Sequence, residues 1–154
     1  MPIFKAIAAM ASNRTIGTQG KLPWHIPEEL RWFRQTTLHQ TLLMGRKTFE
    51  SMGCRALPER TTYVLSSQKM SSYEGVRSIT SIDELTDIQG TIWLCGGAHM
   101  YEQFLPLCSE LFLTVIHKAY EGDAFFPKFE HLFKKQSILK STEDFEVQHW
   151  IKLS

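Results

Sequence analysis

The chain has 154 residues, of which 43% are hydrophobic and 21% are charged, and its formal net charge is +1. These values suit one globular domain, residues 1–154, and give no global field that favours nucleic acid or an acidic membrane surface. The three cysteines form no Cys-x-x-Cys pair and the six histidines follow no metal-binding spacing, so we expect no metal site and a reducing, cytoplasmic compartment. We also expect no signal peptide and no membrane span.

Short apolar runs alternate with helical patterns along the chain. We expect strands at 3–10, 41–44, 61–65, 76–79, 91–95, 110–117, 136–140 and 145–153. We expect helices at 27–38, 46–52 and 97–105, the last one stopped by Pro106, and a capped helix entry at Ser81 with Glu84 three residues on. Residues 12–25 are expected to form a loop. This alternation predicts a single α/β domain with about eight strands: a mostly parallel sheet, helices on both faces, and an antiparallel C-terminal hairpin at its edge.

The first expected helix places a carboxylate on its apolar face. At 100° per residue, Glu29 shares a face with Ile26, Leu30 and Phe33, whereas Glu28 points toward Trp32 and solvent. A carboxylate in an apolar stripe is typical of a group kept for a ligand, because burial penalises its charge. An early-turn glutamate that favours the helix N-terminus and stays hydrated is an equally good interpretation of this segment.

Two expected strand-to-helix turns contain glycine. In Met44-Gly45-Arg46-Lys47-Thr48 and Cys95-Gly96-Gly97-Ala98-His99, a helix start follows a tight turn and presents free N–H groups. Neither turn fits the usual dinucleotide or P-loop pattern, and one such turn alone is usually only a turn. Two on one small sheet suggest an extended ligand with several phosphates at the carboxyl ends of the strands.

The combination of these motifs resembles the dihydrofolate reductase family along nearly the whole chain. The matching stretches are Ile7-Ala8-Ala9-Met10, Ile16-Gly17, Leu22 to Leu30, Met44 to Gly53, Leu57-Pro58, Arg60, Leu65-Ser66-Ser67, Gly96-Gly97, Tyr101 and Glu121-Gly122-Asp123. The resemblance implies an NADPH-dependent reduction of 7,8-dihydrofolate to tetrahydrofolate in one-carbon metabolism. It also implies a monomer that binds antifolate inhibitors.

The resemblance further implies the site residues. Catalytic roles fall to Glu29, Trp24, Leu22 and Thr114, with Glu29 pairing with the 2-amino group and ring nitrogen of the pterin. Substrate contacts fall to Ile7, Ala9, Leu30, Phe33, Met52, Leu57, Arg60, Cys95 and Tyr101, with Arg60 holding the glutamate carboxylate. Cofactor contacts fall to Ala9, Ile16, Gly17, Gly20, Gly45, Arg46, Lys47, Thr48, Leu65, Ser66, Ser67, Gly96, Gly97, Ala98, His99, Met100, Tyr101 and Gln103. Arg46 and Ser67 are the best-placed donors for the 2′-phosphate, with Ser66 and Lys69 next, and a cis peptide is expected between Gly96 and Gly97.

The sequence departs from the commonest family pattern in four places. The pocket acid is Glu29 rather than aspartate, Ala98 replaces a third glycine, His99 stands where arginine is frequent, and Cys54-Arg55-Ala56 replaces a shorter Arg-Pro. Two other functions stay open: a reductase of the same fold acting on another pterin-like or ribosylamine substrate, and a non-catalytic NADPH-binding module. Glu29 together with Arg60 disfavours the first, and the intact carboxylate helix and glycine-bearing loop disfavour the second.

Overall fold

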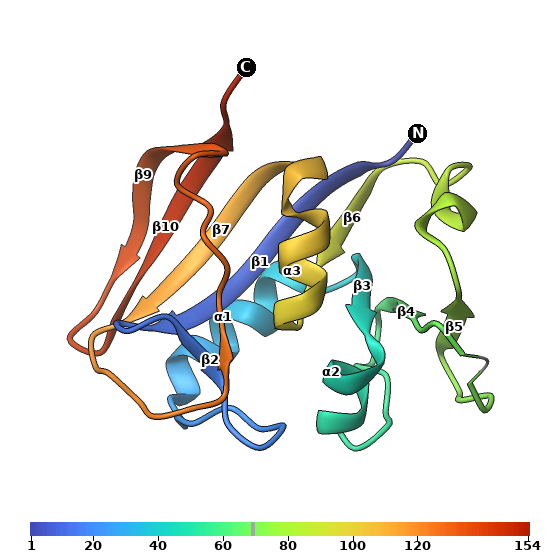
Figure 1. Ribbon diagram of the computed structural model, residues 1–154, viewed down its shortest axis with the longest axis horizontal. Helices are drawn as coiled ribbons and strands as arrows, with labels where there is room; N and C mark the ends of the chain where they lie inside the picture. The colour runs from blue at the N-terminus through green and yellow to red at the C-terminus, as the bar shows by residue number, and fades with distance from the viewer. Residues whose placement is uncertain (69) are drawn as a thin grey trace.

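A computed structural model, which describes residues 1–68 and 70–154, places eight strands in one sheet (Figure 1). Their order across the sheet is β5 (Val76–Ile79), β4 (Thr61–Leu65), β3 (Thr41–Gly45), β6 (Thr91–Leu94), β1 (Ile3–Ala11), β7 (Cys108–Ile116), β10 (Phe145–Lys152) and β9 (Phe133–Ser141). The pairs from β5 to β7 are parallel, and β10 is antiparallel to both β7 and β9. The expected mostly parallel sheet with an antiparallel hairpin at its edge is thus confirmed.

Helices cover both faces of this sheet. They are α1 (Pro27–Thr37), α2 (Arg46–Ser51) and α3 (Ala98–Phe104), with short 3-10 turns η1 (Ile82–Leu85) and η2 (Leu105–Leu107). Successive side chains of β1 point to opposite faces, so Ala6 packs in the core under α3, whereas Ile7 packs in a second core with Phe33 of α1 and Phe49 of α2. Figure 1 shows α3 in front of the sheet and α1 behind it. No helix in the described part of the chain is long and apolar enough to span a lipid bilayer.

Most expected elements are present, and their ends differ by a few residues. The capping box at η1 is confirmed, because Ser81 accepts from the backbone N–H of Asp83 and Glu84 accepts from that of Ser81. Helix α3 ends at Phe104, before Pro106, and Pro106 is the second residue of the 3-10 turn η2 that follows it. Strand β9 is longer than expected, so only residues 142–144 connect it to β10.

The prediction that residues 12–25 form only a loop was wrong. Strand β2 (Thr15–Gly17) pairs in antiparallel fashion with β8 (Ala124–Phe125) in a separate two-stranded sheet. Segments this short carry no recognisable period of hydrophobicity, and the pairing partner lies more than a hundred residues away along the chain. The pairing anchors the base of the segment and leaves its tip at Gly20 exposed.

Candidate active site

Glu29 is the one buried charged residue in the described part of the chain, with 7% of its surface exposed. Burial raises the pKa of its carboxyl group above the ordinary value of 4.5, and the nearby Trp24 indole lowers it by a smaller amount. The hydrated interpretation of Glu29 was therefore wrong. Its neighbour Glu28 is partly exposed and pairs with Lys140 of β9, with 3.2 Å between Nζ and Oε2.

Two further expected site residues are buried, and one of them, Trp24, lies near this carboxylate. Trp24 is 7% exposed, packs against Tyr120 with 5.7 Å between ring centroids, and its buried Nε1 forms no hydrogen bond with the described residues. Thr114 of β7 is 1% exposed and lies opposite Ala9 of β1 in the strand register. A buried donor without a partner is the kind of group that a ligand or an ordered water satisfies.

An apolar cluster between α1, α2 and the sheet unites most of the expected substrate-contact residues. These are Ile7, Phe33, Met52, Leu57 and Cys95, which pack with Phe49 and Trp93. Burial raises the pKa of the Cys95 thiol to about 12, so this residue serves as a small apolar side chain. Leu30 is half-buried on α1, whereas Leu22 is 56% exposed and lies outside the cluster.

Arg60 is fixed to the C-terminal end of α1. Its Nε donates to the Thr37 hydroxyl at 3.2 Å, one terminal nitrogen donates to the Pro58 carbonyl at 2.6 Å, and the other donates to the Arg34 carbonyl. A groove of about 470 Å³ opens beside it, lined by residues 54–60 and 73–75. The segment from α2 into this groove turns through left-handed backbone at Gly53 and Cys54, which is the path of the unusual Cys54-Arg55-Ala56 stretch.

The two glycine turns lie side by side at the carboxyl edge of the sheet. The Gly45 N–H donates to the Gly96 carbonyl at 2.9 Å, and a Cβ on Gly97 would lie 3.0 Å from the Thr48 hydroxyl. Gly96 has a φ of +113°, and the Gly96–Gly97 peptide is cis, as expected. Neither α2 nor α3 has a side-chain cap, so the N–H groups at both helix starts stay free for a ligand.

Several other expected cofactor residues differ in how deeply they are buried. Leu65 ends β4 next to Gly45 in the register, Ser66 is 8% exposed, and Ser67 is exposed. Arg46, Lys47 and His99 are exposed, whereas Met100 and Tyr101 of α3 are buried in the core. The Tyr101 hydroxyl donates to the Ile7 carbonyl at 2.7 Å, which links α3 to the strand that lines the apolar cluster. Lys69 lies outside the described residues.

Contacts from a distant segment hold the glycine-bearing loop near Gly17. The Gln19 N–H donates to the Asp123 carboxylate at 3.1 Å, and the Asp123 N–H donates to the Gly17 carbonyl at 3.0 Å. A Cβ on Gly122 would lie 2.4 Å from that same carbonyl, so only glycine fits there. An ion pair between Arg14 and Glu130 adds a contact that a single sequence gives no signal for.

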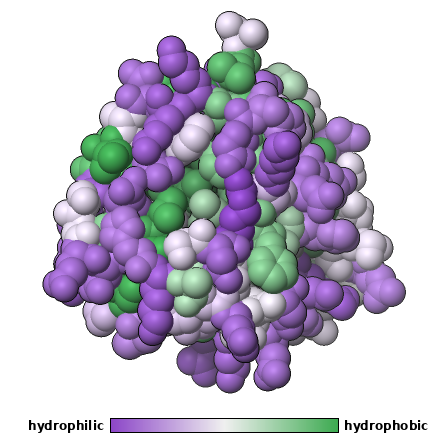
Figure 2. Space-filling model, turned by 60° about the vertical axis from the view of Figure 1, so that its left-hand side comes forward, coloured by the Kyte–Doolittle hydropathy of each residue, from purple (hydrophilic) through white to green (hydrophobic). Residues whose placement is uncertain are grey.

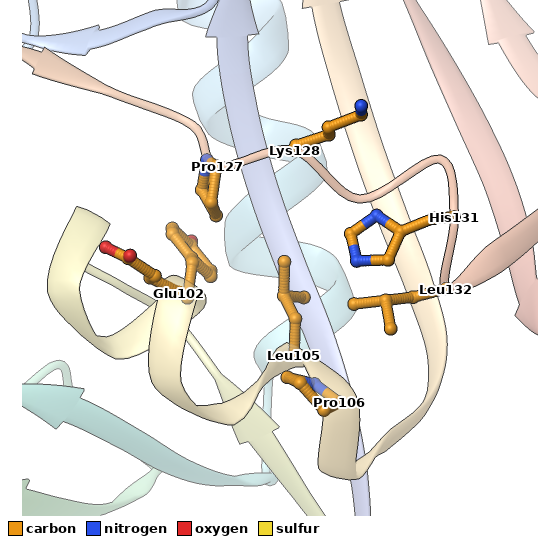
Figure 3. Close-up of a pocket in the computed structure, with 8 residues that line it drawn as sticks. Glu102, Leu105, Pro106, Pro127, Lys128, His131 and Leu132 are labelled. Atoms are coloured by element: carbon orange, nitrogen blue, oxygen red, sulfur yellow. The ribbon is translucent and has the colours of Figure 1, made fainter.

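A separate small cavity of about 250 Å³ lies between α3, η2 and residues 127–132 (Figure 3). Its walls include Leu105, Pro106 and Pro127, and the charged ends of Glu102 and Lys128 point away from one another. Apart from Tyr101, it contains none of the expected site residues.

Comparison with known proteins gives one consistent result. A model of the family "Dihydrofolate reductase" matches residues 3–152. The chain is 39% identical over 142 residues to dihydrofolate reductase of Bacillus subtilis (strain 168), covering 90% of this chain and 84% of that protein. It is 42% identical over 128 residues to that of Haemophilus influenzae (strain ATCC 51907 / DSM 11121 / KW20 / Rd), covering 81% and 79%. A solved structure of dihydrofolate reductase from Enterococcus faecalis, complexed with NADP(H) and RAB-propyl, is 35% identical with a TM-score of 0.90, covering 99% of this chain and 97% of that chain.

Proposed function

The chain belongs to the dihydrofolate reductase family and reduces 7,8-dihydrofolate to 5,6,7,8-tetrahydrofolate with NADPH, and we propose that α1 and the two glycine turns divide this task between substrate and cofactor. This membership sets aside the two other functions that the sequence left open. The proposal concerns which residues perform each role.

The substrate is held at both ends of α1. Glu29 lies in the first turn of the helix, and Thr37, which holds Arg60, lies eight residues later at its end. Eight residues correspond to about 12 Å along a helix axis. A buried carboxylate near the start of α1 and a guanidinium tethered near its end suit a ligand with an amino-substituted ring at one end and a carboxylate at the other. The apolar cluster around Ile7 and Phe33 lies along the same helix and suits the rings between those ends.

The glycine turns suit the diphosphate of NADPH. A Cβ added at Gly45 would lie 3.0 Å from the Met100 side chain, and one added at Gly97 would lie 3.0 Å from the Thr48 hydroxyl. Glycine at both positions therefore leaves room for the diphosphate to approach the protein backbone. The free N–H groups at the starts of α2 and α3, with the Thr48 hydroxyl, would bind phosphate oxygens. Arg46, Ser66 and Ser67 would bind the 2′-phosphate.

In the reaction, bound NADPH supplies the hydride, and the protein supplies alignment and charge. The Glu29 carboxylate binds the 2-amino group and the adjacent ring nitrogen of the pterin, and the Trp24 indole N–H, Thr114 and an ordered water complete that network. The negative charge of Glu29 favours protonation of the imine nitrogen, and water delivers that proton. The segment 12–25, held by Asp123, excludes bulk water during hydride transfer.

The burial of Glu29 carries the proposal, and Glu29→Gln tests it. The variant should bind NADPH with nearly unchanged affinity and lose turnover on dihydrofolate by orders of magnitude, increasingly so as pH rises. The amide cannot stabilise the protonated pterin, so protonation fails sooner at high pH. Steady-state rates across pH and a cofactor titration measure both effects.

The matched control is Glu28→Gln on the same helical turn. Glu28 is partly exposed and pairs only with Lys140 among the described residues, so this variant should keep wild-type rates. If Glu29→Gln also kept wild-type rates at every pH, Glu29 would have no role in the reaction.

We further propose that the protein acts as a monomer of one domain in the cytoplasm and binds antifolate inhibitors against Glu29. The face shown in Figure 2 supports the monomer, because hydrophilic residues cover most of it and hydrophobic residues appear there in small areas.

A further inference from the structure

We propose that Thr37 is a positioning residue for substrate recognition, because its buried hydroxyl sets the orientation of the Arg60 guanidinium. The proposal rests on the role given above to Arg60 as the group that binds the carboxylate tail. It assigns a task to a side chain that lies in the protein interior and belongs to neither the catalytic nor the contact residues.

The hydroxyl of Thr37 has two partners. It donates to the Phe33 carbonyl one helical turn back at 2.8 Å, and it accepts from Arg60 Nε at 3.2 Å. The residue is 0% exposed at the last position of α1. A hydroxyl buried at such a position is unfavourable unless it is hydrogen-bonded, and valine would fill the same volume without that requirement. The contact with Arg60 accounts for a threonine at this place.

The preceding residue, Thr36, shows that a hydrogen bond to the helix backbone does not by itself account for a buried threonine at position 37. The Thr36 hydroxyl donates to the Trp32 carbonyl at 2.8 Å, so both threonines bond to the preceding turn in the same way. Thr36 is only half-buried, and its sole hydrogen-bond partner among the described residues is that carbonyl. The two threonines therefore differ in that only the Thr37 hydroxyl also accepts a hydrogen bond from an arginine among the described residues.

The three bonds of Arg60 decide which edge of its guanidinium faces a ligand. Of the five N–H groups of an arginine, one goes to Thr37, one to the Pro58 carbonyl and one to the Arg34 carbonyl. One N–H therefore remains on each terminal nitrogen. These two can bind both oxygens of one carboxylate, which is the bidentate arrangement that guanidinium favours. Thr37 holds Nε, so without it the planar group could rotate away from the two carbonyls and lose this orientation before substrate arrives.

Thr37→Val removes the hydroxyl and keeps the shape. We expect KM for dihydrofolate to rise several-fold, up to about tenfold, which is the loss typical of one intramolecular hydrogen bond. KM for a dihydropterin that lacks the glutamate tail, and kcat at saturation on both substrates, should stay at wild-type values. Thr37→Ser should restore the low KM for dihydrofolate. Thr36→Val should leave KM unchanged for both substrates.

A spectroscopic measurement checks the cause without enzyme turnover. The Arg60 Nε–H should give a protected signal in 15N NMR spectra of the wild type and of Thr36→Val, and should exchange rapidly with solvent in Thr37→Val. If Thr37→Val does not fold, Thr37→Ala removes the same hydroxyl with a better helix former.

Arg60→Ala separates failure of this inference from failure of the carboxylate role. Should Arg60→Ala raise KM only for the tailed substrate while Thr37→Val leaves it unchanged or affects both substrates equally, Thr37 is not a positioning residue and the role of Arg60 stands. Should Arg60→Ala itself affect both substrates equally, the carboxylate role is rejected and the positioning role with it.

Discussion

A buried carboxylate makes the stability of a protein depend on pH, and Glu29 does so in a predictable direction. Its pKa is raised in the folded chain above the ordinary 4.5, so the folded state keeps this proton to a higher pH than the unfolded state does. The Glu29 carboxyl group therefore makes its full contribution to the free energy of unfolding below about pH 4.5. That contribution is lost as pH rises through the pKa of the folded state. At neutral pH, the residue that the reaction needs lowers the stability of the fold.

Glu29→Gln should accordingly raise the melting temperature at pH 7, because the amide needs no charge in the apolar site. The gain should shrink toward zero well below pH 4.5, where the wild-type carboxyl group is protonated in both states. Thermal unfolding of both proteins at the two pH values measures the difference. A variant that is equally destabilised at both would show that Glu29 makes favourable contacts even when charged.

Cofactor preference is a second property decided by single side chains. The Arg46 guanidinium lies 3.7 Å from the Glu50 carboxylate, and both side chains are about half exposed. Such exposed pairs are weak, so Arg46 can exchange this partner for a phosphate.

Arg46→Ala combined with Ser67→Ala should therefore narrow the preference for NADPH over NADH, since the 2′-phosphate is the group that distinguishes them. The ratio of the two kcat/KM values reports the change. Lys128→Ala is the control, because it removes an exposed charge that lies outside the expected cofactor contacts. An unchanged ratio in the double variant would place phosphate recognition on other residues, with Ser66 first among them.

Some of the residues that matter for the site can be identified from the sequence alone, and others cannot. Glu29 is detectable because helical spacing places it among apolar neighbours, and Gly45 and Gly96 because each follows an apolar run. The roles of Thr37 and Arg14 are not detectable in this way. Their partners, Arg60 and Glu130, lie far along the chain, and only the fold brings each pair together.

At the level of elements, the loop formed by residues 12–25 depends on the segment 121–123. The Asp123 carboxylate accepts from the N–H of Gln19, near the exposed loop tip. Only residues 142–144 join β9 to β10, and we expect this short connection not to hold the loop in a second, inward conformation.

Asp123→Ala should slow hydride transfer and leave the melting temperature nearly unchanged, because it frees an exposed loop. Single-turnover rates in the wild type and in Asp123→Asn, which keeps one acceptor oxygen, provide the comparison. Crystal structures with NADPH plus folate and with NADP⁺ plus a reduced-folate analogue should both show the loop outside the nicotinamide site. A loop folded inward and held by residues 141–144 in the second complex would contradict this expectation.

The elements that sequence predicts best are those with strong periodic patterns. The central strands and α1 match closely, because their apolar residues recur at the strand or helix period. Strands β2 and β8 were not predicted. They have three and two residues, too few for a periodic pattern, and they form only by pairing with one another. The two ends of β9 were also missed, since its exposed lysines resemble a solvated loop.

At the scale of the whole molecule, substrate and cofactor sites share one sheet and should stabilise it together. NADPH at a hundred times its Kd adds about 2.7 kcal/mol to the free energy of unfolding. For a chain of this size, that should raise the melting temperature by roughly 5–10 °C. NADH at the same concentration should give a smaller rise, and a folate analogue should add its own increment on top of NADPH.

Arg60→Ala should reduce the increment from the folate analogue and keep the one from NADPH, because the hydrogen bonds of Arg60 within the described part of the chain go to α1 and Pro58 and not to either glycine turn. Equal reductions of both increments would indicate general destabilisation instead of a lost ligand contact.

The position of β10 has a consequence for protein synthesis. Residues Phe145–Lys152 do not lie at the edge of the sheet but between β7 and β9, where they form ladders with both. While the ribosome is still making this segment, the nascent chain has no partner for β9 and an open edge on β7. The eight-stranded sheet can therefore be completed only after residues 145–152 have left the exit tunnel, and until then β9 has no place in it.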